Sequence, residues 1–225
     1  MPIIQTRMLP RAPQARSDAG FSMVEMLLVI AIIGIVTAMA LVAWFNEMPM
    51  IRADSAMELM ESQVRQARET AVDLRRTIQV TFSSTGTMTT VEQTVNVTTT
   101  PPTVTGTTTL NTFVLDPNTM TYTVLTGVPD TPDKFNSPTN YCVTSSGICF
   151  NNSACGSPAA LPCTINFQGD GTVVNSSGTY INGTIFMAAI GNASNPANPQ
   201  TARAITITGS TGRIKGYRYS GTQWY

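Results

Sequence analysis

Residues 20–45 read GFSMVEMLLVIAIIGIVTAMALVAWF, and this stretch decides how the rest of the chain is organised. From residue 26 to residue 45 it has no charged side chain, and Glu25 stands at its edge. At about 1.5 Å per residue, a helix of this length spans roughly 30 Å, which is the thickness of a bilayer's hydrocarbon core. We therefore predict a single membrane-spanning segment over residues 21–45, in contact with lipid.

The residues before this segment form a basic leader. Residues 1–20 carry three arginines and one aspartate, a net charge of +2. Positive charge beside a span favours the cytoplasmic side, so we expect a cytoplasmic leader and an exported C-terminal part. An ordinary secretory signal is cleaved after its apolar stretch, whereas Gly20 lies before it.

The composition of the 225-residue chain argues against most enzyme classes. It contains no histidine, and 13 basic residues balance 13 acidic ones. Without histidine, a Ser-His or Cys-His catalytic pair cannot form. A zero net charge also argues against a uniformly basic nucleic-acid binder. We find no catalytic constellation and predict a protein that is not an enzyme and has no cofactor.

The order of residues around the leader boundary carries a family resemblance. Residues 20–25, GFSMVE, followed by the apolar stretch, resemble the class III leader of type IV pilins and type II secretion pseudopilins. The resemblance implies that a prepilin peptidase cleaves between Gly20 and Phe21 and methylates the new Phe21 amine. It also implies that Glu25 pairs with the N-terminal ammonium of a neighbouring subunit, since each buried charge offsets the other's desolvation cost. Val42 is a departure, because many major pilins have a proline midway along this stretch.

Residues 46–76 are predicted to continue as an amphipathic helix. Its apolar side chains recur at steps of three and four: Ala56, Leu59, Met60, Val64, Ala67, Ala71 and Leu74. Such a stripe packs on a sheet, and we expect the charged face, including a Glu61–Arg65 pair, to be solvated.

Residues 77–225 are predicted to form a β-rich head. Twenty of the fifty residues 77–126 are threonine, and β-branched residues suit a pleated surface. We expect strands at residues 77–82, 94–100, 111–116 and 121–127, and a terminal hairpin that turns at residues 209–212. The predicted fold class is α+β, in which a long N-terminal pilin helix, half of it transmembrane, packs on an antiparallel β-sheet or β-sandwich head.

Three segments sharpen the resemblance: SQVRQARETAVDLRR (62–76), NFQGDGTV (166–173) and RAITITGSTGRIK (203–215). Together they resemble the GspH/FimT branch of minor pilins. This implies a structural subunit of a type II secretion pseudopilus or a type IV pilus tip. Its partners would be other pilins or pseudopilins, the prepilin peptidase and the inner-membrane assembly platform. It would cross the bacterial inner membrane once, with a periplasmic head, before entering a periplasmic pseudopilus or a cell-surface pilus. An abundant pilus subunit is an alternative.

Four cysteines lie close together in the head, in a loop over residues 142–163. They are Cys142, Cys149, Cys155 and Cys163. Their spacing lacks the CxxC pairs of zinc sites, and an even number in an exported segment favours disulfides. Three connectivities are open, of which we favour the sequential pairs Cys142–Cys149 and Cys155–Cys163, which close two short loops. The aspartates Asp130, Asp133 and Asp170 fit turns and lack a calcium-ligand series, so we predict no metal site.

The C-terminal strand is basic and aromatic. Arg213, Lys215 and Arg218 stand among tyrosines, and such a pattern can hold a phosphate backbone and stack bases. Some FimT-type minor pilins bind DNA through a C-terminal Gly-Arg-x-Arg motif, which here reads Gly212-Arg213-Ile214-Lys215. Binding of DNA for natural transformation is therefore a second hypothesis, beside protection of an edge strand by charge.

Overall fold

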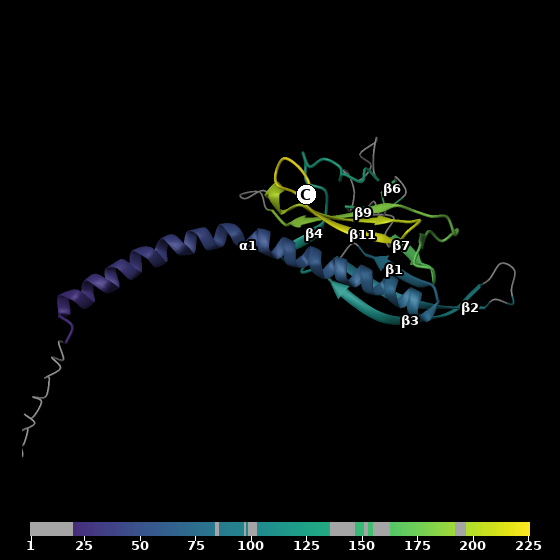
Figure 1. The fold of residues 1–225 in the computed structure, drawn as a ribbon, viewed down its shortest axis with the longest axis horizontal. Helices are drawn as coiled ribbons and strands as arrows, with labels where there is room; N and C mark the ends of the chain where they lie inside the picture. The colour runs from purple at the N-terminus through teal and green to yellow at the C-terminus, as the bar shows by residue number, and fades with distance from the viewer. Residues whose placement is uncertain are drawn as a thin grey trace, which may run out of the picture. The chain divides into compact units, whose positions relative to one another are not determined.

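The computed structural model describes residues 20–83, 86–96, 98, 103–135, 147–150, 153–154, 163–191 and 197–225. Its first element is α1 (Met23–Leu74), one helix that contains both the apolar stretch and the amphipathic segment (Figure 1). Pro49 lies inside this helix without ending it. Of the predicted leader, Gly20 is described, and residues 1–19 lie outside the described residues.

The second half of α1 presents one buried stripe. Its members recur at steps of four and three: Ala53, Met57, Met60, Val64, Ala67 and Ala71. This 3.5-residue repeat keeps a narrow face toward the strands. The prediction was wrong for Leu59 and Leu74, which are exposed. Leu59 lies about 100° around the helix from Met60, and Leu74 is the last residue of α1.

The first sheet has five antiparallel strands in the order β3-β2-β1-β7-β8. They are β1 (Ile78–Phe82), β2 (Thr87–Asn96), β3 (Thr103–Val114), β7 (Cys163–Phe167) and β8 (Val173–Val174). The strand predicted at residues 77–82 is confirmed as β1, whose alternate residues are buried. β2 and β3 begin well before the strands predicted at residues 94–100 and 111–116.

The second sheet runs in the order β11-β10-β9-β5-β6, and β4 also pairs with β9. Its strands are β4 (Met120–Tyr122), β5 (Ile148–Phe150), β6 (Ser153–Ala154), β9 (Gly183–Ala189), β10 (Arg203–Thr208) and β11 (Arg213–Arg218), with the short 3-10 helix η2 (Pro199–Thr201) before β10. The predicted terminal hairpin is confirmed as β10–β11. At its turn Gly212 has φ +61° and lies so close to the Gly171 carbonyl oxygen that a Cβ would stand 1.8 Å from it.

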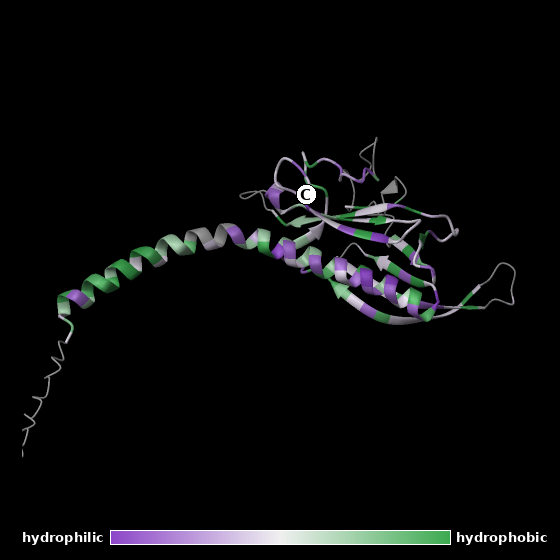
Figure 2. Ribbon diagram, in the orientation of Figure 1, coloured by the Kyte–Doolittle hydropathy of each residue, from purple (hydrophilic) through white to green (hydrophobic). Residues whose placement is uncertain are grey.

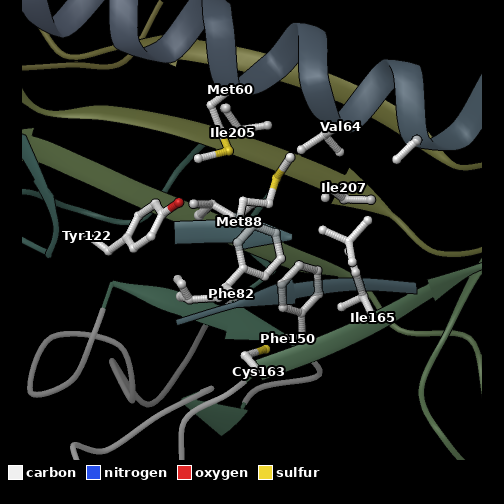
Figure 3. Packing of buried hydrophobic residues seen from close by; sticks show 14 of the residues in the cluster. Met60, Val64, Phe82, Met88, Tyr122, Phe150, Cys163, Ile165, Ile205 and Ile207 are labelled. Carbon is white, nitrogen blue, oxygen red and sulfur yellow. The ribbon is translucent and has the colours of Figure 1, made fainter. Parts of the chain in front are cut away.

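The core lies between the two sheets and beneath α1. Met60 and Val64 of α1 meet side chains of both sheets there, among them Phe82 from β1 and Ile205 from β10 (Figure 3). A second cluster, which includes Tyr217 and Trp224, covers the other face of the β9–β11 sheet. This arrangement confirms the α+β class: an N-terminal helix packed on antiparallel sheets.

The chain divides into two compact units, residues 1–44 and residues 45–225. In the first unit, the described side chains of α1 are exposed, and all of them except Glu25 and Thr37 are apolar (Figure 2). The second unit contains both apolar clusters, and polar and apolar residues alternate along its part of α1. The described side chains of the first unit are therefore exposed, whereas the second unit has a core of its own.

Candidate functional site

The residues at the predicted cleavage site are accessible. Gly20, Phe21 and Ser22 precede α1 without regular secondary structure, and Phe21 is 75% exposed. Glu25 lies in the first turn of α1, where the helix dipole favours a carboxylate. An exposed segment of irregular backbone is what a protease requires, so the Gly20–Phe21 bond is open to cleavage.

The first part of α1 has the properties of a membrane span. The window Met23–Leu41 is long and apolar enough to cross a bilayer, and none of it is buried. The Thr37 hydroxyl donates a hydrogen bond to the Ile33 carbonyl (2.7 Å), so it needs no outside partner. The other polar side chain of this window is Glu25, and within the described part of the chain its carboxylate has no hydrogen-bond or ion-pair partner. A carboxylate so placed calls for a positive group from another molecule or for contact with water.

Arg218 of the basic strand faces α1. Its guanidinium contacts the Asp54 carboxylate at 3.1 Å and the Glu58 carboxylate at 2.8 Å. Arg203, directly opposite on β10, shares Asp54 at 2.7 Å, and its side chain is 4% exposed. Arg203 also donates to the backbone carbonyls of Gln200 and Ala202. Arg218 thus belongs to an ion-pair network that fastens α1 to the β10–β11 hairpin.

Arg213 and Lys215 point to the opposite face of the same strand. Arg213 contacts the Asp133 carboxylate at 3.0 Å, and the Thr206 hydroxyl donates to that carboxylate at 2.6 Å. Burial raises the pKa of Asp133, but hydrogen bonds from Thr206 and Tyr217 and the Arg213 charge together bring it below its ordinary value. Lys215 places its ammonium 4.3 Å from the centre of the Tyr217 ring. Each of the three predicted DNA-binding cations therefore has a partner within the chain, in α1 for Arg218 and in the head for Arg213 and Lys215.

A basic recess lies where α1 meets the turn of the β10–β11 hairpin. Its volume is about 350 Å³, and it is lined by Arg65, Arg68, Glu69, Thr211, Gly212, Arg213 and Ile214. Arg68 donates to the carbonyls of Gly171 (3.2 Å) and Thr211 (3.3 Å), while Arg65 pairs with Glu61 (2.6 Å) as predicted. The recess brings Arg213 close to two cations of α1 that the sequence alone did not connect with it.

The described cysteines lie in different sheets. Cys149 is buried in β5 and Cys163 is the first residue of β7, and both are disulfide-bonded. Cys142 and Cys155 lie outside the described residues, so the sequential pairing stays a prediction. The Asp170 carboxylate accepts from the backbone and hydroxyl of Thr172, in agreement with a turn.

Comparison with known proteins bears on the N-terminal segment. The family described as the prokaryotic N-terminal methylation motif matches residues 15–41, and here that motif leads into an apolar helix and antiparallel sheets. The N-terminal segment of the chain thus carries the prokaryotic N-terminal methylation motif. Among solved structures, the chain is similar to the type IV minor pilin FimU of Pseudomonas aeruginosa, with 15% sequence identity and a TM-score of 0.41. The alignment covers 76% of this chain and 91% of that chain. No curated protein matches the chain.

Sequence reasoning missed the Asp54–Arg203 pair. The two residues are 149 positions apart, and Asp54 was not singled out in the helix pattern. The sequence did contain one indication of this pair. Arg203 lies on the same face of the strand as Ile205 and Ile207, and a charged side chain on a buried face requires a partner of opposite charge. The charged face of α1, predicted to be solvated, in fact supplies Glu58 and Arg68 to contacts with the strands and turns.

Proposed function

We propose that this pilin-like chain is a structural subunit, without catalytic activity, of a type II secretion pseudopilus or a type IV pilus tip. In this proposal the prepilin peptidase removes residues 1–20 and methylates Phe21. The span then holds the subunit in the inner membrane with its head in the periplasm. The assembly platform subsequently moves it into a filament of pilins or pseudopilins.

The observation that supports the proposal most is that the side chains of the predicted span are exposed. The methylation motif covers residues 15–41, and within it none of the apolar window Met23–Leu41 is buried. Lipid can cover such a helix before assembly, and the apolar helices of neighbouring subunits can cover it afterwards. Glu25 would then accept the ammonium of a neighbour's processed N-terminus, because two isolated charges in an apolar environment are costlier than a pair.

An apolar groove in the second unit offers a further contact for a neighbouring subunit. Its volume is about 490 Å³. α1 contributes Met48, Ile51 and Leu59, while Val114 and Met120 come from β3 and β4. Ile51 and Leu59 are exposed although they are large and apolar. Coverage by another subunit would remove this surface from water, which is favourable.

Exchange of Glu25 tests the proposal. In cells that assemble the filament, the Glu25→Ala variant is expected to be cleaved and to stay in the membrane, but to enter sheared filaments at least about tenfold less than wild type. The matched control is Glu47→Ala, which removes the next acid along α1, also exposed, and is expected to assemble normally. If Glu25→Ala enters filaments as often as wild type does, Glu25 has no role in assembly.

DNA binding is the second candidate, and the basic recess is the observation that favours it. Arg213 lies there with Arg65 and Arg68, so a phosphate would meet cations from two elements. Arg218, by contrast, is engaged with α1. A gel shift of the detergent-solubilised full chain with duplex DNA would show salt-sensitive binding that the Arg65→Ala/Arg213→Ala variant loses. Absent or salt-insensitive binding would exclude this function.

A further inference from the structure

In the described part of the chain the two sheets have five edge strands, β3, β4, β6, β8 and β11, and all except β3 are protected against pairing with another chain. β8 and β6 have two residues each and β4 has three, too few to serve as a template. β11 carries Arg213, Lys215 and Arg218. Natural proteins protect their edges by short strands and charged side chains of this kind.

The end of β11 is also covered by the chain itself. The amide of Arg218 donates to the Tyr225 carbonyl (3.1 Å), and the amide of Tyr225 donates to the Arg218 carbonyl (3.0 Å). Tyr219 and Trp224 form an isolated antiparallel bridge. The C-terminus thus acts as a short additional strand beside β11, which leaves less of this edge open.

β3 has neither kind of protection. It is 12 residues long, reads TVTGTTTLNTFV, and contains no charged residue and no proline. It ends the strand order of its sheet, and no strand in the described part of the chain pairs with its outer side. Nearly every residue of β3 is exposed, including the apolar Val104, Leu110 and Val114. A long uncharged edge of this kind is a template for an added strand.

The irregularities of β3 leave part of this edge regular. Its pairing with β2 shifts register between Thr90 and Val91 and again between Thr94 and Val95. Between the two shifts, residues 106–109 pair with β2 in unbroken register. Bulges are one way to twist an edge away from partners, but here they flank a regular stretch whose side chains are small or β-branched.

We propose that β3 is an interaction edge that pairs antiparallel with β3 of a second copy of this chain. An edge without charge meets no like-charge repulsion when it faces itself, and a two-fold axis makes such a contact self-complementary. Opposed threonines can form cross-strand hydrogen bonds and pack their methyl groups. The other described edges of a second copy do not fit as well, because β4, β6 and β8 are short and β11 is charged and partly covered.

The experiment uses the full chain in detergent micelles at a fixed ratio of detergent to protein. Sedimentation velocity gives its association state, and hydrogen–deuterium exchange gives the protection of residues 103–114 as the protein concentration rises. We expect a dimer whose formation slows exchange in residues 103–114. Association through the spans alone would leave exchange in this segment unchanged and would contradict the proposal, as would a monomer at every concentration.

Two lysines on β3 test whether this edge makes the contact. Thr107→Lys/Thr109→Lys places charges on exposed positions of the regular stretch, and we expect dimerisation to weaken on the order of tenfold. The matched control, Ser176→Lys/Thr179→Lys, adds the same charge at exposed positions of the loop after β8 and should dimerise as wild type does. Equal dimerisation of both variants would overturn the proposal. If the β3 variant does not fold, the concentration-dependent exchange of the wild-type chain still decides.

Discussion

The edge strands β3 and β11 use similar backbone geometry for opposite purposes. β11 carries three cations, and each of them contacts a partner in α1 or in the head. β3 carries no charge, and its exposed threonines leave the edge of the first sheet open. The difference shows that the charge of an edge strand can be structural even where its sequence suggests a binding patch. The strand without an evident motif is the one that offers a surface to a partner.

The largest effect should come from the ion pairs that fasten β11 to α1. Asp54→Ala would leave the buried Arg203 with backbone carbonyls as its acceptors. We expect a loss of about 2–3 kcal/mol in the free energy of unfolding, less than for a fully buried pair because Asp54 is 31% exposed. Denaturant titration measures this loss. Asp73→Ala, at an exposed position of the same helix, is the control and should change stability by less than about 0.5 kcal/mol.

Removal of the charges from β11 should make it resemble β3. The Arg213→Thr/Lys215→Thr variant would present an edge without its two outermost cations, and we expect on the order of tenfold stronger self-association than in wild type. Sedimentation velocity would detect the change. An unchanged association constant would mean that the C-terminal residues 224–225, rather than charge, protect this edge.

The Arg213–Asp133 pair predicts a dependence of stability on pH. Because the folded pKa of Asp133 is lowered, the carboxylate stabilises the fold fully above the unfolded pKa of about 3.9 and loses this effect as pH falls through the folded value. At pH 7, Asp133→Asn should be less stable than wild type by about 0.5–1 kcal/mol, since Arg213 is 56% exposed. Unfolding curves between pH 7 and about pH 2 should show the difference shrink below about pH 4. A constant difference would contradict this role.

The smallest effect is expected at Lys215. Its ammonium lies over the Tyr217 ring in an exposed position, where such contacts are worth about 0.5 kcal/mol. Lys215→Met keeps the length of the side chain and should reduce stability by no more than that. A loss of more than about 1.5 kcal/mol would show that Lys215 has a structural role that the geometry does not explain.

The parts of the fold with a clear period could be predicted from sequence. The uninterrupted apolar stretch predicts the first part of the helix α1, and the alternation of Ile205 and Ile207 with threonines predicts the strand β10. β3 could not be predicted at its true length, because residues 103–109 are mainly threonine and carry no apolar alternation. The prediction placed Leu59 in the buried stripe of α1, whereas the structure buries Met57 and exposes Leu59. Either residue is compatible with the helical spacing of the stripe, and only packing against the strands decides which one is buried.

The candidate site was predicted unevenly for a related reason. The motif at Gly20, Phe21 and Glu25 is contiguous, so it can be recognised without a structure. The partners of the basic strand come from distant segments: Asp54 and Glu58 from α1, and Asp133 from a loop. Only the folded arrangement shows that these acids neutralise cations that looked free in the sequence.

The measurement that tests the proposed function most directly is the intact mass of the chain from cells that contain the prepilin peptidase. We predict the loss of residues 1–20 and one added methyl group on the amine of Phe21. Cells without the peptidase should yield the uncleaved chain. A full-length chain in the presence of an active peptidase, or cleavage after the apolar segment, would contradict the assignment of this protein as a processed, membrane-anchored filament subunit.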